Sequence, residues 1–306
     1  MIIDIAFVNS RKFFVLLLFG LFFIGLGYIS LLPVFEGFDE NAHYSRVREI
    51  ANSTSSMFEK ESYIDQLIID YGGPMPYSSG TPPYSHENTY DNFFAQESLV
   101  GNYKDQYINK PLDSNFNPSN EINWQIQHPP LYYFLVSRLG IVSDKLPISY
   151  QFFALRVTSY LFVLIGILFG AMAVSNIVGH DSEIKIANMR LGFLIYPLIF
   201  PMFFLEFARV GNDSLCILLV GITAYLMSLW HKDKGTSIIS IAIGVILSLG
   251  LITKALFIPI TAAVGFVLLL NITKTSTKGI KLKLFKSSFL IFLPICLIGG
   301  SYYLFQ

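Results

Sequence analysis

Long stretches without a single charged residue or histidine constrain the fold of this 306-residue chain more than any other feature. A helix needs about 20 apolar residues to cross the ~30 Å hydrocarbon core of a bilayer. Because lipid cannot pair with exposed backbone N–H and C=O groups, such stretches are expected to be helical. Seven stretches qualify or come close, namely 13–35, 157–179, 191–205, 214–230, 235–253, 255–273 and 287–306.

The sequence therefore predicts an all-α integral membrane protein, a bundle of about seven transmembrane helices forming one module, 1–306. A large first external loop, 36–150, is expected to contain short helices. The expected spans are 13–35, 152–178, 186–206, 213–230, 236–253, 255–272 and 287–305. The run 235–273 is about twice as long as a bilayer requires, so two helices are expected to meet near Lys254.

The distribution of charge predicts the orientation. Segment 274–286 carries five lysines and no acidic residue, and Arg11 and Lys12 precede the first span, so both regions are expected to be cytoplasmic. Loop 36–150 then lies outside and contains 15 acidic residues against 7 Lys or Arg. The chain's 21 basic residues balance its 21 acidic ones, so it lacks the basic surface that a nucleic-acid-binding protein needs.

A first candidate for chemistry follows the first span directly. Asp39 and His43 are four residues apart and Glu40 and His43 three apart, so a helix places both carboxylates and the imidazole on one face. A carboxylate in such a group is suited to act as a general base. The same residues also suit a helix start, because Asp39 is a favourable N-cap and acidic residues offset the helix dipole.

A second candidate is His128, which precedes two prolines and the aromatic segment 131–134. Proline favours the first helical position, so His128 would be held where the external loop meets the membrane interface. The alternative is a proline-initiated interfacial helix with Tyr132 and Tyr133 in the aromatic belt and His128 solvated.

Three cations lie at predicted external membrane edges: Arg156, Arg209 and Lys254. Together they could bind a lipid phosphate by charge-assisted hydrogen bonds and stabilise it as a leaving group. Taken singly, each also fits a snorkelling anchor or an ion pair with Glu206 or Asp213.

Other cofactor chemistry has little support. The sequence contains no Walker loop, dinucleotide fingerprint, HExxH or GxSxG motif. A divalent metal could find oxygen and nitrogen ligands at Asp39, Glu40, His43 and His128, but their spacing does not require one, so no metal site and no cofactor is assigned. Cys216 and Cys296 lie in apolar stretches and are expected to pack as small core residues.

The order of these motifs resembles the GT-C superfamily of integral-membrane glycosyltransferases, in particular bacterial members similar to protein O-mannosyltransferases and the lipid A aminoarabinose transferase. The resemblance covers about 12–306. It rests on the Asp-Glu-Asn-Ala-His segment 39–43, the His-Pro-Pro-Leu-Tyr-Tyr segment 128–133, Ala-Leu-Arg at 154–156, segment 209–213 and Leu-Ile-Thr-Lys at 251–254. The mannosyltransferases have a motif one residue shorter than 39–43, so the acceptor class does not carry over.

The resemblance implies an enzyme of the bacterial inner membrane with its active site outside and its N-terminus in the cytoplasm. The donor would be a sugar on a polyprenyl phosphate, and the acceptor a lipid, glycan or protein. Asp39 would be the catalytic base of an inverting transfer and Glu40 would assist it, with His43 and His128 lining the pocket. Relatives continue into further spans, so a minimal enzyme, a fragment or a partner supplying those spans is expected.

Two hypotheses of different classes follow. The first is a polyprenyl-phosphate-sugar-dependent glycosyltransferase. The second is a non-catalytic membrane scaffold of a polysaccharide or cell-envelope glycan assembly complex. A transporter is disfavoured, because transport sites lie near the membrane midplane between repeated, broken helices, whereas these charges gather at one face.

Overall fold

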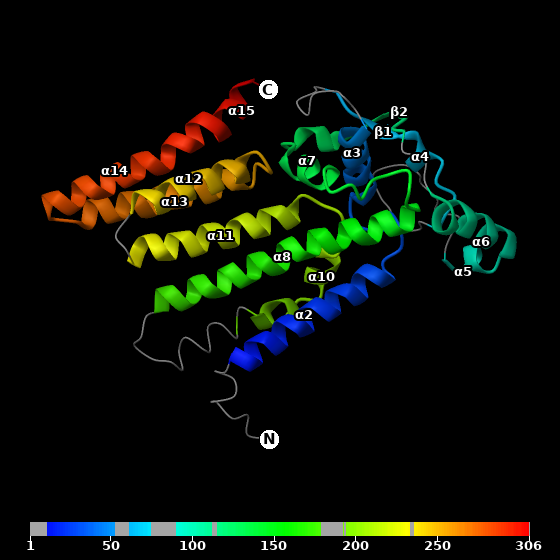
Figure 1. The fold of residues 1–306 in the computed structure, drawn as a ribbon, viewed down its shortest axis with the longest axis horizontal. Helices are drawn as coiled ribbons and strands as arrows, with labels where there is room; N and C mark the ends of the chain where they lie inside the picture. The colour runs from blue at the N-terminus through cyan, green and yellow to red at the C-terminus, as the bar shows by residue number, and fades with distance from the viewer. Residues whose placement is uncertain are drawn as a thin grey trace, which may run out of the picture. The chain divides into compact units, whose positions relative to one another are not determined.

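A computed structural model of the chain describes residues 11–52, 61–74, 90–111, 115–178, 192, 194–232 and 236–305. These residues are mostly helical and belong to two compact units (Figure 1). The helical unit comprises Met1–Phe22, Phe162–Phe200 and Asp213–Gln306, and the loop unit comprises Phe23–Leu161 and Pro201–Asn212. Helices α2 (Arg11–Leu31) and α8 (Ile148–Val178) each contribute residues to both units.

Five helices in the described part of the chain are long and apolar enough to cross a membrane: Phe13–Leu31, Ile148–Ile177, Asp213–Lys232, Phe257–Lys274 and Lys278–Leu304. They support the prediction of a helical membrane protein. Helix α12 (Ser237–Leu251) is apolar, but its 15 residues extend about 22 Å, less than the hydrocarbon core. The described residues therefore give five clear spans rather than the seven expected.

The predicted third span, 186–206, is not one continuous helix. Residues 179–191 and 193 lie outside the described residues. Residues 194–199 are helical, but the helix stops at Phe200, and α10 (Met202–Phe207) begins after Pro201. Proline lacks a backbone N–H and disfavours the helical conformation of the residue before it, which explains the interruption.

The last long helix begins before the predicted span 287–305. Helix α14 (Lys278–Pro294) begins within the lysine-rich segment that was expected to be a loop, and it continues through the π-helical segment η3 (Ile295–Gly300) into α15 (Ser301–Phe305). Lysine is a good helix former and its aliphatic stem covers apolar surface, so charge alone does not end a helix.

In the helical unit, α12 packs against α11 (Asp213–Lys232) and α14, and α14 also packs against α13 (Phe257–Lys274), as Figure 1 shows. The chain turns between α12 and α13 at Lys254, as predicted. Helices α8 and α11 approach closely, because a Cβ on Gly221 would lie 2.1 Å from the carbonyl oxygen of Gly166. Small residues at such crossings allow the close backbone contact on which membrane helices rely.

The loop unit is built around helix α3 (Glu40–Asn52), which packs against α7 (Leu131–Ser137), strand β1 and the 3-10 segment η2. The remaining elements, in chain order, are β1 (Tyr63–Asp65), α4 (Gln66–Ile69), α5 (Tyr90–Phe94), α6 (Glu97–Tyr103), the π-helical segment η1 (Lys104–Asn109), β2 (Pro118–Ile122) and η2 (Trp124–Gln127).

Strands β1 and β2 pair antiparallel, with Tyr63 opposite Ile122, so the all-α prediction is wrong for this small sheet. Ile64 lies in β1, whereas Leu67 and Ile68 lie in α4. The aromatic and β-branched pair Tyr63 and Ile64 favours extended backbone.

Helix α3 is unusual because it is polar and yet buried along nearly its whole length, from Glu40 to Ile50. Its charged side chains pair inside the unit: Arg48 Nε lies 2.6 Å from Asp65 Oδ2, and Arg46 Nη1 lies 2.5 Å from Glu49 Oε2. Because buried charges are costly unless paired, these contacts hold α3 in one position.

Candidate functional site

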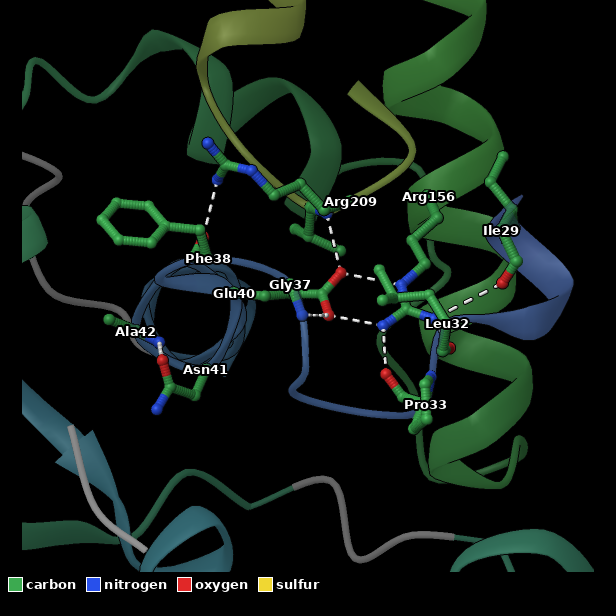
Figure 2. Close-up of polar contacts among 11 residues, drawn as sticks. Ile29, Leu32, Pro33, Gly37, Phe38, Glu40, Asn41, Ala42, Arg156 and Arg209 are labelled. Atoms are coloured by element: carbon green, nitrogen blue, oxygen red, sulfur yellow. Dashed lines mark hydrogen bonds and ion pairs between the residues drawn. The ribbon is translucent and has the colours of Figure 1, made fainter. Parts of the chain in front are cut away.

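The centre of the candidate site is an ion pair between Glu40, the first residue of α3, and Arg156 of α8 (Figure 2). Arg156 Nε lies 2.7 Å from Glu40 Oε1, and Arg156 Nη2 lies 2.5 Å from Glu40 Oε2. Glu40 also accepts hydrogen bonds from the backbone N–H of Val210 at 2.9 Å and of Gly37 at 3.4 Å. The carboxylate is fully buried, so its four partners replace water completely.

The guanidinium of Arg156 has further partners in the backbone that leaves α2. Nη1 donates to the carbonyl oxygens of Leu32 at 2.5 Å and Ile29 at 3.5 Å, and Nη2 donates to that of Pro33 at 2.7 Å. With the two bonds to Glu40, all five N–H donors of the guanidinium are used. In this arrangement Arg156 positions the chain between α2 and α3 and has no donor left for a phosphate.

The chain between α2 and α3 is strained at two places. Phe35 has a φ of 66° and Asp39 a φ of 55°, and these are the only non-glycine residues with positive φ among the described residues. Aspartate tolerates this conformation better than most residues, whereas for phenylalanine it is a true outlier. Such strain persists only where surrounding contacts enforce it, and it concentrates at functional sites.

Asp39 and Glu40 are adjacent in sequence but differ in their surroundings. Glu40 is fully buried, and its carboxylate is held by Arg156 and two backbone N–H groups, whereas Asp39 is half-buried. The carbonyl of Asp39 accepts the N–H of His43 at 3.0 Å, whereas Asp39 itself precedes α3 and has a non-helical φ of 55°. The structure thus separates the two carboxylates into one fixed group and one group nearer the surface.

Arg209 follows α10 and binds the same turn from another direction. Its Nη1 donates to the carbonyl oxygen of Phe38 at 2.7 Å, its guanidinium lies 5.8 Å from the centre of the Phe38 ring, and its Nη2 pairs with Glu206. The Glu206 side chain is 42% exposed and that of Arg209 only 4%. Figure 2 shows the Arg209 guanidinium turned toward Phe38 and away from the Glu40 carboxylate that faces Arg156.

His43 is part of a buried chain of hydrogen bonds. Its Nδ1 lies 2.9 Å from the hydroxyl of Tyr133, which donates its proton to Gln125 Oε1 at 3.2 Å. The hydroxyl of Tyr133 thus connects His43 of α3 to Gln125 of η2. The imidazole is therefore oriented by residues of η2 and α7.

Gly211 brings the segment after α10 against this network. A Cβ at Gly211 would lie 2.8 Å from Arg209 Nη1 and 3.8 Å from His43 Nε2, so a glycine lets the backbone approach both groups. The N–H of Gly211 donates to the hydroxyl of Tyr132 at 3.2 Å, and that hydroxyl lies 2.7 Å from Ser159 Oγ. Burial raises the pKa of Tyr132 to about 12.

Two predicted site residues, His128 and Lys254, have no contact with Glu40, Arg156 or Arg209 among the interactions described above. His128 ends η2 and is half-buried, and its N–H bonds the carbonyl of Gln125 at 3.1 Å. Lys254 belongs to the helical unit, where its Nζ lies 2.6 Å from Asp213 Oδ1. The described residues contain no cluster of three or more His, Cys, Asp or Glu side chains that could hold a metal ion.

Several contributors to the site were not expected from the sequence, namely Gln125, the hydroxyls of Tyr132 and Tyr133, and the N–H groups of Val210 and Gly211. The two tyrosines were interpreted as interface anchors, yet both are fully buried. No local spacing marks these residues, because each acts through a partner distant in sequence.

No protein-family model, curated protein or solved structure matches the chain.

Proposed function

We propose that this protein transfers a sugar from a polyprenyl-phosphate donor to an acceptor at the external face of a bacterial inner membrane. In this proposal Asp39 removes a proton from the acceptor as the acceptor attacks the anomeric carbon. The bond between that carbon and the phosphate oxygen breaks, the configuration inverts, and the polyprenyl phosphate leaves as an anion.

The main support for the proposal is a hydrogen bond between Arg209, a candidate phosphate-binding residue, and the peptide group directly before Asp39, the candidate base. Arg209 Nη1 donates to the carbonyl of Phe38, the residue directly before Asp39. A carboxylate to activate the acceptor and a guanidinium to stabilise a phosphate leaving group are both needed near the reacting carbon.

The ion pairs distinguish the two arginines. Arg156 is held by the fully buried Glu40, whereas Arg209 pairs with Glu206, whose exposed carboxylate can move into solvent when an anionic ligand arrives. We assign phosphate binding to Arg209 and positioning to Arg156 and Glu40. The pocket-lining role of His128 and the phosphate role of Lys254 remain predictions from the sequence.

The alternative is a non-catalytic scaffold of a glycan assembly complex. It is favoured by the fact that each of the three cations, Arg156, Arg209 and Lys254, pairs with a carboxylate of the protein itself. In a scaffold these ion pairs would stay intact. A scaffold also would not require Asp39 to be half-buried at a strained backbone position.

Transfer by purified protein in liposomes distinguishes the two functions. A panel of radiolabelled polyprenyl-phosphate sugars is offered to the wild type, to Asp39→Asn and to Asp91→Asn, which changes an exposed carboxylate of the same unit. We expect transfer by the wild type and by Asp91→Asn, and a loss of at least 100-fold for Asp39→Asn, within the typical range for general-base catalysis. Equal turnover by Asp39→Asn would exclude the base role, and no transfer with any donor would favour the scaffold.

The phosphate role of Arg209 has its own readout. Arg209→Gln should raise the KM for the donor and also lower kcat, because the guanidinium holds the donor phosphate and stabilises it as it leaves. Glu206→Gln, which releases the guanidinium, should leave the KM unchanged or lower it. A KM for Arg209→Gln equal to that of the wild type would contradict the assignment.

A further inference from the structure

Asn212 is the most unusual polar residue of the loop unit. Its side chain is fully buried, and neither Nδ2 nor Oδ1 has a hydrogen-bond partner among the described residues. Almost all buried polar groups in proteins are paired, so an amide with both atoms unpaired requires an explanation. Because Asn212 directly precedes α11, it could cap that helix, but a cap would give Oδ1 a backbone N–H as its partner.

The residues before Asn212 belong to the candidate site. Val210 donates its N–H to Glu40 and Gly211 donates its N–H to Tyr132. Arg209 Nη1 occupies the side of Gly211 where a Cβ would lie. This backbone is therefore held by α3 and α7, and Asn212 follows it directly in the chain, three residues after Arg209.

The chemistry of an amide indicates the kind of ligand. Nδ2 provides two donors and Oδ1 an acceptor, so a full set of partners must both accept and donate hydrogen bonds. Sugar hydroxyls do both, whereas a phosphate that has lost its protons only accepts. A ligand hydroxyl that restores the partners of a buried amide is recognised strongly, because its loss leaves polar groups unpaired.

We infer that Asn212 is a sugar-binding residue whose amide pairs with hydroxyl groups of the donor sugar, separately from the phosphate. This inference rests on the proposed function for the identity of the donor. It adds a residue that recognises the transferred group, where Arg209 recognises the leaving group.

The test compares two lipids by thermal unfolding of the full chain in detergent. The first probe is a polyprenyl phosphate, and the second is the same lipid carrying one hexose, one N-acetylhexosamine or one pentose. For the wild type we expect both probes to raise Tm, and one sugar-bearing lipid to raise it further. That additional rise is the sugar increment.

Asn212→Leu replaces the amide with an apolar group of similar size. We expect a Tm without lipid equal to or above that of the wild type, the full rise with polyprenyl phosphate, and no sugar increment. Asn120→Leu, at an exposed position of β2 in the same unit, is the matched control and should keep the increment. If Asn212→Leu does not fold, Asn212→Ser shortens the side chain and should still reduce the increment.

Three results would overturn the inference: no sugar increment in the wild type with any probe, an undiminished increment in Asn212→Leu, or a lower Tm without lipid in both Asn212 variants, which would mark a structural amide. The transfer assay separates this inference from the proposed function. A wild type that shows the increment but transfers nothing refutes glycosyl transfer and leaves the assignment of Asn212 intact. A wild type that transfers while Asn212→Leu keeps the increment refutes only Asn212.

Discussion

Arg156 and Glu40 form a buried, two-point ion pair in which Nε and Nη2 of the guanidinium face the two carboxylate oxygens at 2.7 and 2.5 Å. The same guanidinium binds three carbonyl oxygens at the end of α2. One side chain of α8 thus determines where α2 ends and where α3 begins. The strained turn that carries Asp39 lies between these two points.

Replacing Arg156 should destabilise the protein more than replacing any exposed arginine. In Arg156→Lys a single ammonium cannot satisfy five acceptors, so Glu40 loses one of its paired contacts and the carbonyls lose theirs. We expect the free energy of unfolding to fall by about 1–3 kcal/mol, because the charge stays paired while buried acceptors lose their donors. Denaturant unfolding in detergent measures the change. Arg138→Lys, at an exposed position, is the control, and equal losses for the two variants would contradict the positioning role.

A methyl group at Gly37 should disturb the same turn. A Cβ there would lie 2.8 Å from Arg209 Cβ and 3.0 Å from the Glu40 carboxyl group, both of which are held by ion pairs. Gly37→Ala should therefore cost about 1–3 kcal/mol of stability and reduce transfer. In the control, Gly72→Ala, the added methyl meets nothing within 4 Å. If Gly37→Ala has the Tm and the activity of Gly72→Ala, the turn is less tightly packed than the structure indicates.

Stability should decline at alkaline pH partly because of Tyr132. Its pKa rises from 10 to about 12 in the folded protein, first because of burial. The unfolded chain releases the phenol proton near pH 10 and the folded protein near pH 12, so this stabilisation is complete below pH 10 and is lost between pH 10 and 12. The loss amounts to about 1.4 kcal/mol per pH unit.

Unfolding of Tyr132→Phe over the same pH range measures this contribution. The variant loses the hydroxyl's hydrogen bonds but should show a shallower decline above pH 10 than the wild type. Tyr150→Phe, at an exposed position, is the comparison. An unchanged slope in Tyr132→Phe would mean that other groups cause the alkaline loss.

A polar contact among three helices should stabilise the helical unit. Trp230 Nε1 of α11 donates to Ser287 Oγ of α14 at 2.7 Å, and that hydroxyl also bonds Ser240 of α12. Ser287→Ala leaves the buried indole N–H without its partner, so we expect a loss of about 1 kcal/mol. Ser288→Ala removes a hydroxyl that bonds only its own helix, at Leu284, and should change Tm less. The reverse order would exclude the contact as a link between helices.

Much of the architecture could be predicted because a bilayer imposes a length and a polarity on its helices. The apolar stretches became α2, α8, α11 and α13, and Lys254 marks the turn between α12 and α13. Boundaries were less predictable. Helix α14 begins at Lys278, since lysines do not stop a helix, and Pro201 interrupts a stretch that hydropathy alone treats as continuous.

For the candidate site, the spacing of residues in the sequence predicted contacts only between residues within one or two helical turns of each other. The sequence predicts that Asp39 and His43 share a helical turn, and the Asp39 carbonyl does accept the N–H of His43, although Asp39 itself precedes α3. It could not distinguish the roles of Asp39 and Glu40, because that difference comes from Arg156 and Val210. Neither could it identify Asn212 as unusual, because asparagine before a helix is ordinarily a cap.

The amino-acid sequence by itself determined the apolar helices and the separation of acidic and basic loops, because these depend on helix geometry and on transfer between water and lipid. Only the tertiary structure decided which charges neutralise one another. Glu40 and Arg156 are 116 residues apart, and their pairing arises from the packing of the loop unit rather than from any local pattern. That packing buries Glu40, leaves Asp39 half-buried, and places Arg209 on the peptide group between Phe38 and Asp39.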